Sequence, residues 1–199
     1  MLVSCVPLTA AAASGESFRH LLPYALIAAA VVVALQVGIA WVFRGAPASR
    51  TRWNLWDMLV YWGTIGSVAL LGVTSLVAVL RDGALGGWPL FIHMVGAGAF
   101  TAALPVIAVS WAHANRLPLR TATGRTAPPK FFGISKPMFW LILVGGLVVT
   151  LTMLVSMLPI FGSDGLLTLL DVHRWAGLIV VAAAAVHLAS VTLSRFGLR

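Results

Sequence analysis

The stretch "DVHRWAGLIVVAAAAVHLA", residues 171–189, places His173 and His187 inside an apolar run long enough to cross a bilayer. An ionisable side chain is costly in hydrocarbon, and it marks a functional site by default. The two histidines are 14 residues apart, so on a helix they are separated by about 21 Å along the axis and about 40° around it. They share one helix face at two depths, and each therefore needs a partner from another helix.

A haem iron, held between the facing helices of a bundle, takes axial imidazoles of this kind. His93 is the partner that the sequence offers to His173, because both lie just inside the same predicted membrane boundary. Gly96 follows His93, and Gly177 comes one turn after His173; a porphyrin edge packs closely where side chains are absent. Close helix packing explains such glycines equally well. The alternative for the two histidines is a pair of interfacial residues that only form hydrogen bonds near the headgroups.

Other polar residues offer further chemistry. Arg174 could pair with a haem propionate, or it could be an ordinary interfacial arginine. His113, in "WAHANR", lies at the opposite boundary and points away from the haem face unless Pro105 kinks its helix. There an imidazole could hydrogen-bond a quinone carbonyl and relay protons, or it could be a solvated helix-end residue. We expect His20 to be a capping or surface residue.

The elements that must position these residues are membrane helices. Of the 199 residues, 60% are hydrophobic and 9% are charged, and the mean hydropathy is +1.00. A helix needs about 20 apolar residues to cross the hydrocarbon core. The composition therefore predicts an all-α integral membrane bundle of five transmembrane helices. The expected spans are approximately 21–43, 58–80, 89–112, 138–161 and 172–193.

The distribution of charge predicts the topology. Ten of the 13 lysines and arginines fall in segments 44–52, 116–136 and 195–199. Four of the five acidic residues fall on the other side: Glu16, Asp82, Asp164 and Asp171. By the positive-inside rule the N-terminus is outside and the C-terminus inside. Because these basic residues are explained by membrane topology, the net charge of +8 does not indicate nucleic-acid binding.

The tryptophans, the single cysteine and the opening residues give three further indications about the chain. Seven of the eight tryptophans lie near predicted helix ends, where the headgroup layer favours an amphipathic ring. The single Cys5 excludes an internal disulfide and a cysteine-ligated cluster made by these residues alone. The opening "MLVSCVPLTAAAASGES" has the small residues of a signal peptide but no basic n-region, which leaves its cleavage open.

Three stretches together resemble a known family. They are "FIHMVGAGAFTAALPVIAVSWAHANRLP", "KFFGISKPMFWLILVGGLVVT" and "DVHRWAGLIVVAAAAVHLA". The chain resembles, over about residues 50–193, the cytochrome b (gamma) subunit of membrane-bound respiratory formate dehydrogenases. The second stretch is similar to the family's "aromatic, N, x, G, Q, K, x, x, F, W" segment, matched in order by Phe132, Gly133, Lys136, Phe139 and Trp140. Residues 1–45 then form an extra N-terminal segment with one helix, and residues 46–199 form a cytochrome b-type four-helix haem-binding domain.

The resemblance implies a set of sites and partners. It implies that His93 and His173 ligate a haem b near the outer face, and that His187 ligates a second haem near the cytoplasmic face. It also implies that His113 and Asn115 border a quinone pocket. The setting would be a bacterial-type inner membrane. An iron-sulfur or cytochrome redox subunit would dock on the outer side, and we expect that contact at loops 81–88 and 162–171.

One position departs from the family pattern. The family's fourth histidine stands in an "R, x, x, H, W" sequence, and here Arg52 to Trp56 place Leu55 at that position, which cannot bind iron. Met58 follows one turn later, and a thioether is a haem ligand in other cytochromes. A methionine is also a common filler of helix interfaces. One haem is expected, and the second is left open, with Met58, a partner residue or no residue as its other ligand.

The interpretation that follows is a haem b membrane subunit of a respiratory oxidoreductase complex. It would pass electrons between a partner redox subunit and the membrane quinone pool, and haem and quinone would carry the redox chemistry. The same module could serve a hydrogenase or a sulfur-compound reductase. A different class is a small proton channel or transporter that uses the histidines as a relay. A third is a purely structural anchor.

Overall fold

The structure, a computed structural model, describes residues 6–42, 53–115 and 132–195. Over these residues it consists of five α-helices and no strands. They are α1 (Val6–Val42), α2 (Leu55–Asp82), α3 (Gly87–Trp111), α4 (Phe132–Ser156) and α5 (Ser163–Arg195). All five contain a segment long and apolar enough to cross a membrane. The predicted all-α, five-span multi-pass architecture is therefore confirmed.

All five helices begin before the spans expected from hydropathy, and α4 ends at Ser156 rather than at 161. The clearest error concerns residues 162–171, which we expected to form a loop. α5 begins at Ser163, so most of this segment is helical, and only 157–162 connect it to α4. Asp164 lies in the first turn, where a negative charge favours a helix N-terminus, and Thr168 donates a hydrogen bond back to its carbonyl. Hydropathy missed these turns because their polar residues lie outside the apolar window.

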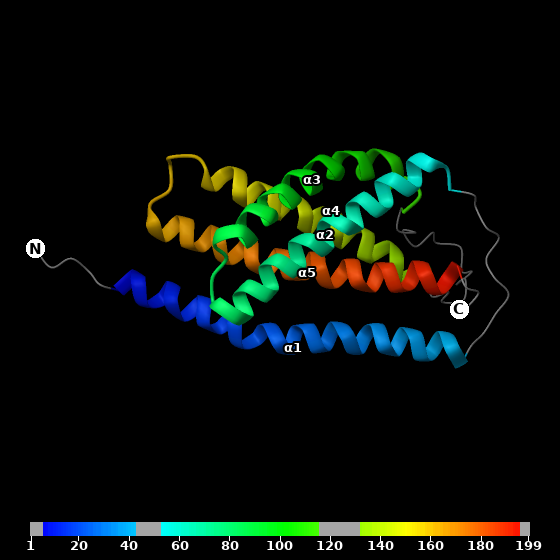
Figure 1. The fold of residues 1–199 in the computed structure, drawn as a ribbon, viewed down its shortest axis with the longest axis horizontal. Coiled ribbons are helices and arrows are strands. Elements are labelled where there is room, and N and C mark those ends of the chain that lie inside the picture. The colour runs from blue at the N-terminus through cyan, green and yellow to red at the C-terminus, as the bar shows by residue number, and fades with distance from the viewer. Residues whose placement is uncertain (1–5, 43–52, 116–131, 196–199) are drawn as a thin grey trace, which may run out of the picture.

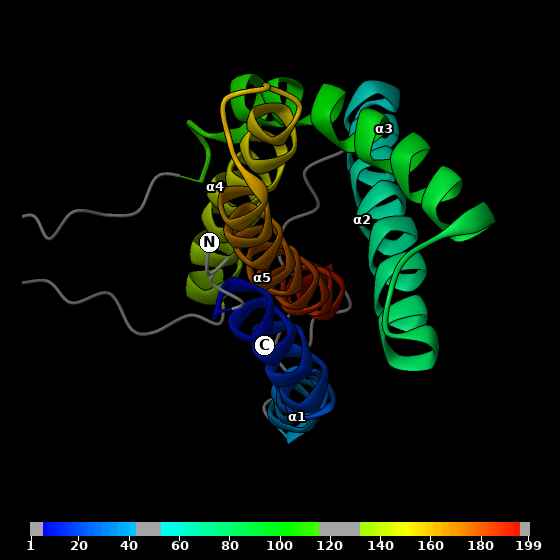
Figure 2. The same ribbon diagram turned by 90° about the vertical axis from the view of Figure 1, so that its left-hand side faces the viewer.

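The helices that follow α1 form two antiparallel hairpins. α2 packs mainly against α3, and α4 packs mainly against α5. Gly83 ends α2 in the left-handed conformation, with φ of 76°, and its N–H donates to the Val79 carbonyl. Figure 2 views the molecule along the helices, with the α2–α3 hairpin beside the α4–α5 hairpin. The chain thus builds its bundle from two similar units.

The bundle has two ends, which serve below as reference points. The turn end holds Asp82, Gly87, Ser156 and Ser163, where the two hairpins reverse direction. The loop end holds the start of α2 and α4 and the end of α3 and α5. In Figure 1 the turn end is on the left and the loop end on the right, and the start of α1 and the end of α5 lie at opposite ends. α3 contains Pro105 and is visibly bent.

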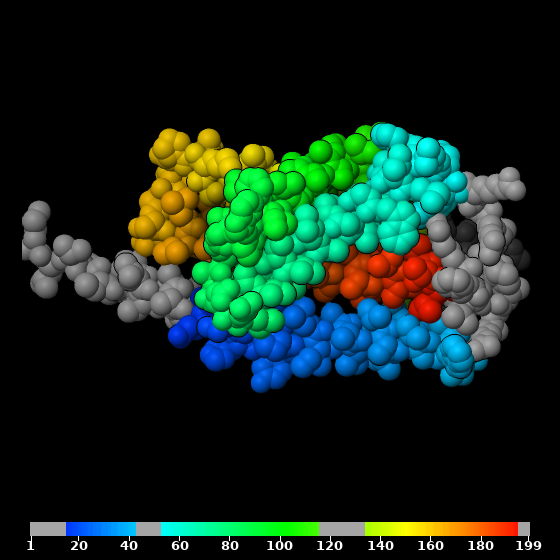
Figure 3. Space-filling model, in the orientation of Figure 1, coloured from blue at the N-terminus to red at the C-terminus, as the bar shows by residue number. Residues whose placement is uncertain are grey.

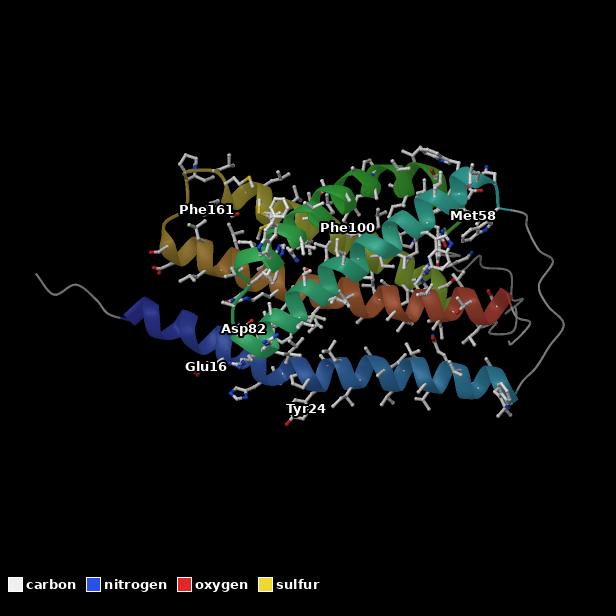
Figure 4. The ribbon with its side chains drawn as sticks, viewed as in Figure 1. Glu16, Tyr24, Met58, Asp82, Phe100 and Phe161 are labelled. Atoms are coloured by element: carbon white, nitrogen blue, oxygen red, sulfur yellow. The ribbon has the colours of Figure 1, made fainter. Side chains whose placement is uncertain are left out.

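Close packing joins the hairpins in the middle of the bundle. The main buried cluster combines residues of α2, α3, α4 and α5: Val68, Phe100, Leu104, Ile107, Ile142, Val180, Ala183 and Ala184. Glycines allow this approach, because a Cβ at Gly146 would come within 2.8 Å of Phe100, and one at Gly72 within 3.1 Å of Val181. Phe100 lies midway along the bundle in Figure 4. An apolar layer therefore lies between the turn end and the loop end of the bundle.

α1 is an added helix that packs on α5. A second buried cluster joins Phe18 and Leu22 of α1 to Leu178 of α5. The Phe18 and Trp175 rings meet edge to face at 5.0 Å. Nearer the loop end, Gln36 Nε2 donates to Ser190 Oγ at 3.2 Å. Figure 3 shows α1 along the lower edge with α5 visible between it and α2. From Gly15 on, most apolar side chains of α1 are exposed, as expected of a lipid-facing surface.

Candidate functional site

The first candidate residue, His93, is held by the α2–α3 hairpin. It lies on α3 near the turn end, where Nδ1 is 3.1 Å from Thr74 Oγ1 of α2. The Thr74 hydroxyl gives its proton to the Leu70 carbonyl at 2.7 Å, so its oxygen accepts from His93. Nδ1 of His93 therefore carries the proton, and Nε2 presents a lone pair.

The second, His173, is held in the same manner by the α4–α5 hairpin. Its Nδ1 lies 3.1 Å from Thr152 Oγ1 and 3.3 Å from the Val149 carbonyl. The Thr152 hydroxyl donates to that same carbonyl at 2.8 Å, so both neighbours of Nδ1 act as acceptors. His173 is consequently also an Nδ1 donor, and its Nε2 is left with a lone pair.

The two rings come together across the hairpins. His93 and His173 lie near enough for a charge on one ring to be felt at the other, although α3 and α5 make few direct contacts with each other. Neither ring is exposed; both are partly buried near the turn end. Two neutral imidazoles, each with Nε2 available, are the ligand set that haem iron takes on its two axial sides. Both histidines thus lie in the turn-end part of their helices, and their pairing at one iron stays a prediction.

The glycines near the two histidines, Gly96 and Gly177, have different surroundings. A Cβ at Gly96 would lie 3.2 to 3.4 Å from the side chains of Leu70 and Leu71, so this glycine serves the packing of α2 on α3. A Cβ at Gly177 would meet nothing within 4 Å. Gly177 follows His173 by one turn and so lies on the same helix face. The open position is thus on α5, one turn from His173, and the use of either glycine toward a porphyrin stays a prediction.

Arg174 lies beside this site at the turn end. Its Nη1 is 3.4 Å from Asp171 Oδ1, and both side chains are about a quarter exposed. The same Nη1 would lie 3.4 Å from a Cβ at Gly15, so the guanidinium also approaches α1. A partly exposed pair of this kind contributes little to stability. Arg174 can therefore exchange Asp171 for another carboxylate at low cost.

His187 lies away from this pair, near the loop end. Its Nδ1 donates to the Ser135 carbonyl of α4 at 3.0 Å, which again leaves Nε2 with the lone pair. The residue of α2 beside it is Tyr61, whose ring centre is 6.4 Å away at an interplanar angle of 45°. Trp53 and Trp111 both pack on Tyr61, so three aromatic rings gather near this histidine.

Two residues of α2 were considered at the second ligand position of an inner haem: Leu55, which cannot bind iron, and Met58, one of the alternatives left open. Leu55 is 73% exposed and Met58 is 46% exposed. Figure 4 places Met58 at the loop end of α2. The residue that α2 sets against the imidazole is Tyr61, one turn further into the membrane. A Met58 ligand would require a different arrangement of this end of the helix.

The residues expected to border a quinone are found at the loop end. His113 is exposed, in the turn that follows α3. Asn115 is fixed: its side-chain amide donates to the Trp111 carbonyl at 3.0 Å, and its own carbonyl accepts from Trp140 Nε1 at 2.9 Å. α3 and α4 are joined by this contact, and Trp140 was part of the family-like motif. His113 and Asn115 thus lie at the same end of the bundle as His187.

Comparison of the chain with protein-family models, with curated proteins and with solved structures finds no match. Within the described residues, no group of three or more His, Cys, Asp or Glu side chains could hold a metal ion. A haem needs fewer protein ligands than a bare ion, because the porphyrin supplies four nitrogens and the chain one or two. The functional argument therefore depends on the histidines and their surroundings.

Sequence reasoning missed the hydrogen-bond partners of the histidines. Thr74, Thr152 and Ser135 lie on the preceding helix of the same hairpin, and Tyr61 lies on α2. A usable signal was present for Thr74 alone. It lies eight residues before the end of α2, and His93 lies six residues after the start of α3, which places the two at similar depth in antiparallel helices. Thr152 lies four residues before the end of α4 and His173 ten residues after the start of α5, so equal distance from the turn would not have paired them.

Proposed function

We propose that this chain is a haem b electron-transfer subunit of a respiratory membrane complex, and that His93 and His173 supply the two axial nitrogens of one haem near the turn end. The observation that carries the proposal is the placement of two imidazoles from separate hairpins near the same end of the bundle, each held at Nδ1 by a threonine hydroxyl. When bound, the haem supplies one-electron chemistry. The resemblance to the formate dehydrogenase gamma subunit supports the same assignment.

The surroundings of the pair fit such a group. The absence of a side chain at Gly177 leaves space on the face of α5 that carries His173. Arg174 supplies a cation for a propionate at the membrane boundary, where its present partner is a partly exposed carboxylate. Each hairpin holds its own ring through a threonine hydroxyl at Nδ1, so the chain itself restrains the rotation of both imidazoles.

The loop end is the side proposed for quinone. His113 is exposed there and could exchange protons with water, and Asn115 lies two residues on. By the charge distribution this end faces the cytoplasm of a bacterial-type inner membrane. A redox partner, an iron-sulfur or cytochrome subunit, would then dock at the turn end, against the α2–α3 turn and the start of α5. The partner could equally be a hydrogenase or a sulfur-compound reductase.

The apolar centre of the bundle disfavours the proton-relay alternative. His187 is about 21 Å from His173 along α5, and the main buried cluster between the two levels is made of Val, Phe, Leu, Ile and Ala side chains. None of these can carry a proton, and the buried hydroxyls of Thr64 and Ser67 both donate to carbonyls of their own helix. Electron transfer does not need a polar path, so the same layer is compatible with a haem subunit.

The visible absorption spectrum of the purified chain tests the proposal. A haem b subunit gives a reducible spectrum with Soret and alpha bands and at least one haem per chain. A proton channel or a structural anchor gives no haem spectrum. A correctly folded, haem-free protein obtained from cells that make b-type cytochromes would contradict the proposed function.

A further inference from the structure

Thr74 and Thr152 occupy equivalent places in the two hairpins. Each belongs to the first helix of its hairpin, near the turn end, and each hydroxyl lies 3.1 Å from Nδ1 of the histidine on the second helix. In both cases the carbonyl three residues earlier, of Leu71 or Val149, lies beside the same imidazole. The arrangement of hydroxyl, carbonyl and imidazole is thus built twice.

Both hydroxyls are oriented as acceptors by their own helix. Thr74 donates to the Leu70 carbonyl at 2.7 Å, and Thr152 donates to the Val149 carbonyl at 2.8 Å. Donation to a carbonyl polarises the hydroxyl and makes its oxygen a better acceptor. A back-bonded threonine gives a helix no stability in itself, and valine would fill the same volume. The hydroxyls therefore have a use at the imidazoles rather than in the helices.

We propose that Thr74 and Thr152 are positioning residues: each accepts the Nδ1 proton of its histidine, fixes the rotation of the ring and strengthens Nε2 as an iron ligand. This inference rests on the proposed haem at His93 and His173. Hydrogen bonding at the distal nitrogen of a ligating histidine raises its basicity. A more basic pair of imidazoles stabilises ferric over ferrous iron, which lowers the reduction potential of the haem.

Valine substitutions in the full-length chain test the proposal. Thr74→Val and Thr152→Val keep the side-chain shape and leave only the neighbouring carbonyl as acceptor. We expect the midpoint potential of the low-spin haem to rise, its electron paramagnetic resonance g values to shift, and haem retention to weaken by about tenfold. Thr74→Ser and Thr152→Ser, which keep the hydroxyl, should restore the wild-type values.

A matched control is available on α2. Thr64 is buried and donates to the carbonyl four residues earlier, that of Val60, at 2.7 Å, as Thr74 does to Leu70, but it has no histidine partner. Thr64→Val should leave the potential and the g values unchanged. Bound haem with wild-type potential and g values in both Thr74→Val and Thr152→Val would overturn the positioning role while leaving the haem proposal intact.

A second measurement does not depend on haem. Nitrogen-15 chemical shifts of the two histidines in the haem-free chain should show Nδ1 protonated and Nε2 unprotonated. In the valine variants the signals should move toward a mixture of the two tautomers. Protonated Nε2 in the wild-type chain would contradict the inference directly. Absence of haem from the wild-type chain, with the expected tautomers present, would refute the proposed function alone.

Discussion

Gly146 on α4 lies directly against Phe100 on α3, so closely that a Cβ on the glycine would come within 2.8 Å of the aromatic ring. Leu104 lies equally near the same position. Phe100 is only 2% exposed, and the contact is part of the apolar layer that separates the His93 and His173 pair from His187. The distance between the hairpins is therefore set at their middle by a missing side chain.

Gly146→Ala should destabilise the bundle by about 1 to 3 kcal/mol, because Phe100 and Leu104 must move to admit a methyl group. Gly177→Ala is the matched control, since a Cβ there meets nothing within 4 Å. It should leave stability unchanged or raise it by up to about 1 kcal/mol through helix propensity. Thermal unfolding in detergent measures both. Equal effects of the two substitutions would contradict the packing described.

The open position of Gly177 leads to a second prediction. Gly177→Leu should fold, yet it should reduce haem content, because the new side chain enters the space on the face of α5 that carries His173. Gly98→Leu introduces the same side chain at an exposed position of α3 with equally open surroundings. Haem-to-protein ratios of the two variants should differ, with Gly98→Leu equal to wild type. Full haem content in Gly177→Leu would place the haem elsewhere.

Hydropathy was sufficient to predict the five helices, because each span must satisfy the same length and apolarity. It could not place the first turns of α5, where Asp164 and Thr168 stabilise a helix through local polar contacts. Helical spacing placed His173 and His187 at different depths, and the predicted membrane boundaries placed His93 level with His173. The partners Thr74, Thr152 and Tyr61 depend on how the helices face each other, which periodicity within one helix does not contain.

The inner histidine gives a third prediction. Tyr61, rather than Met58, is beside His187, so a second bis-axial haem has no ready ligand from the described part of α2. His187→Ala should leave the low-spin signal of the first haem unchanged. Any second haem should be high-spin and reactive to carbon monoxide, and His187→Ala should remove it. Met58→Leu should change neither signal. Two bis-histidine signals per chain would contradict this arrangement.

Quinone access gives the fourth prediction. His113→Ala should slow the reoxidation of haem by quinone, because it removes an exposed imidazole at the end proposed for proton exchange. The spectrum of the haem should stay as in wild type, since His113 lies at the opposite end from His93 and His173. His20→Ala, at an exposed position near the turn end, serves as the control. Unchanged quinone kinetics in His113→Ala would assign the quinone site to other residues.

The central claim, that His93 and His173 hold one haem between the two hairpins, is tested most directly by the low-spin haem signal per chain in single variants. Wild-type protein should give one bis-histidine signal by electron paramagnetic resonance. His93→Ala and His173→Ala should each abolish it, because a low-spin ferric haem of this kind needs both imidazoles, whereas His187→Ala should retain it. An unchanged low-spin signal in both His93→Ala and His173→Ala would contradict the account.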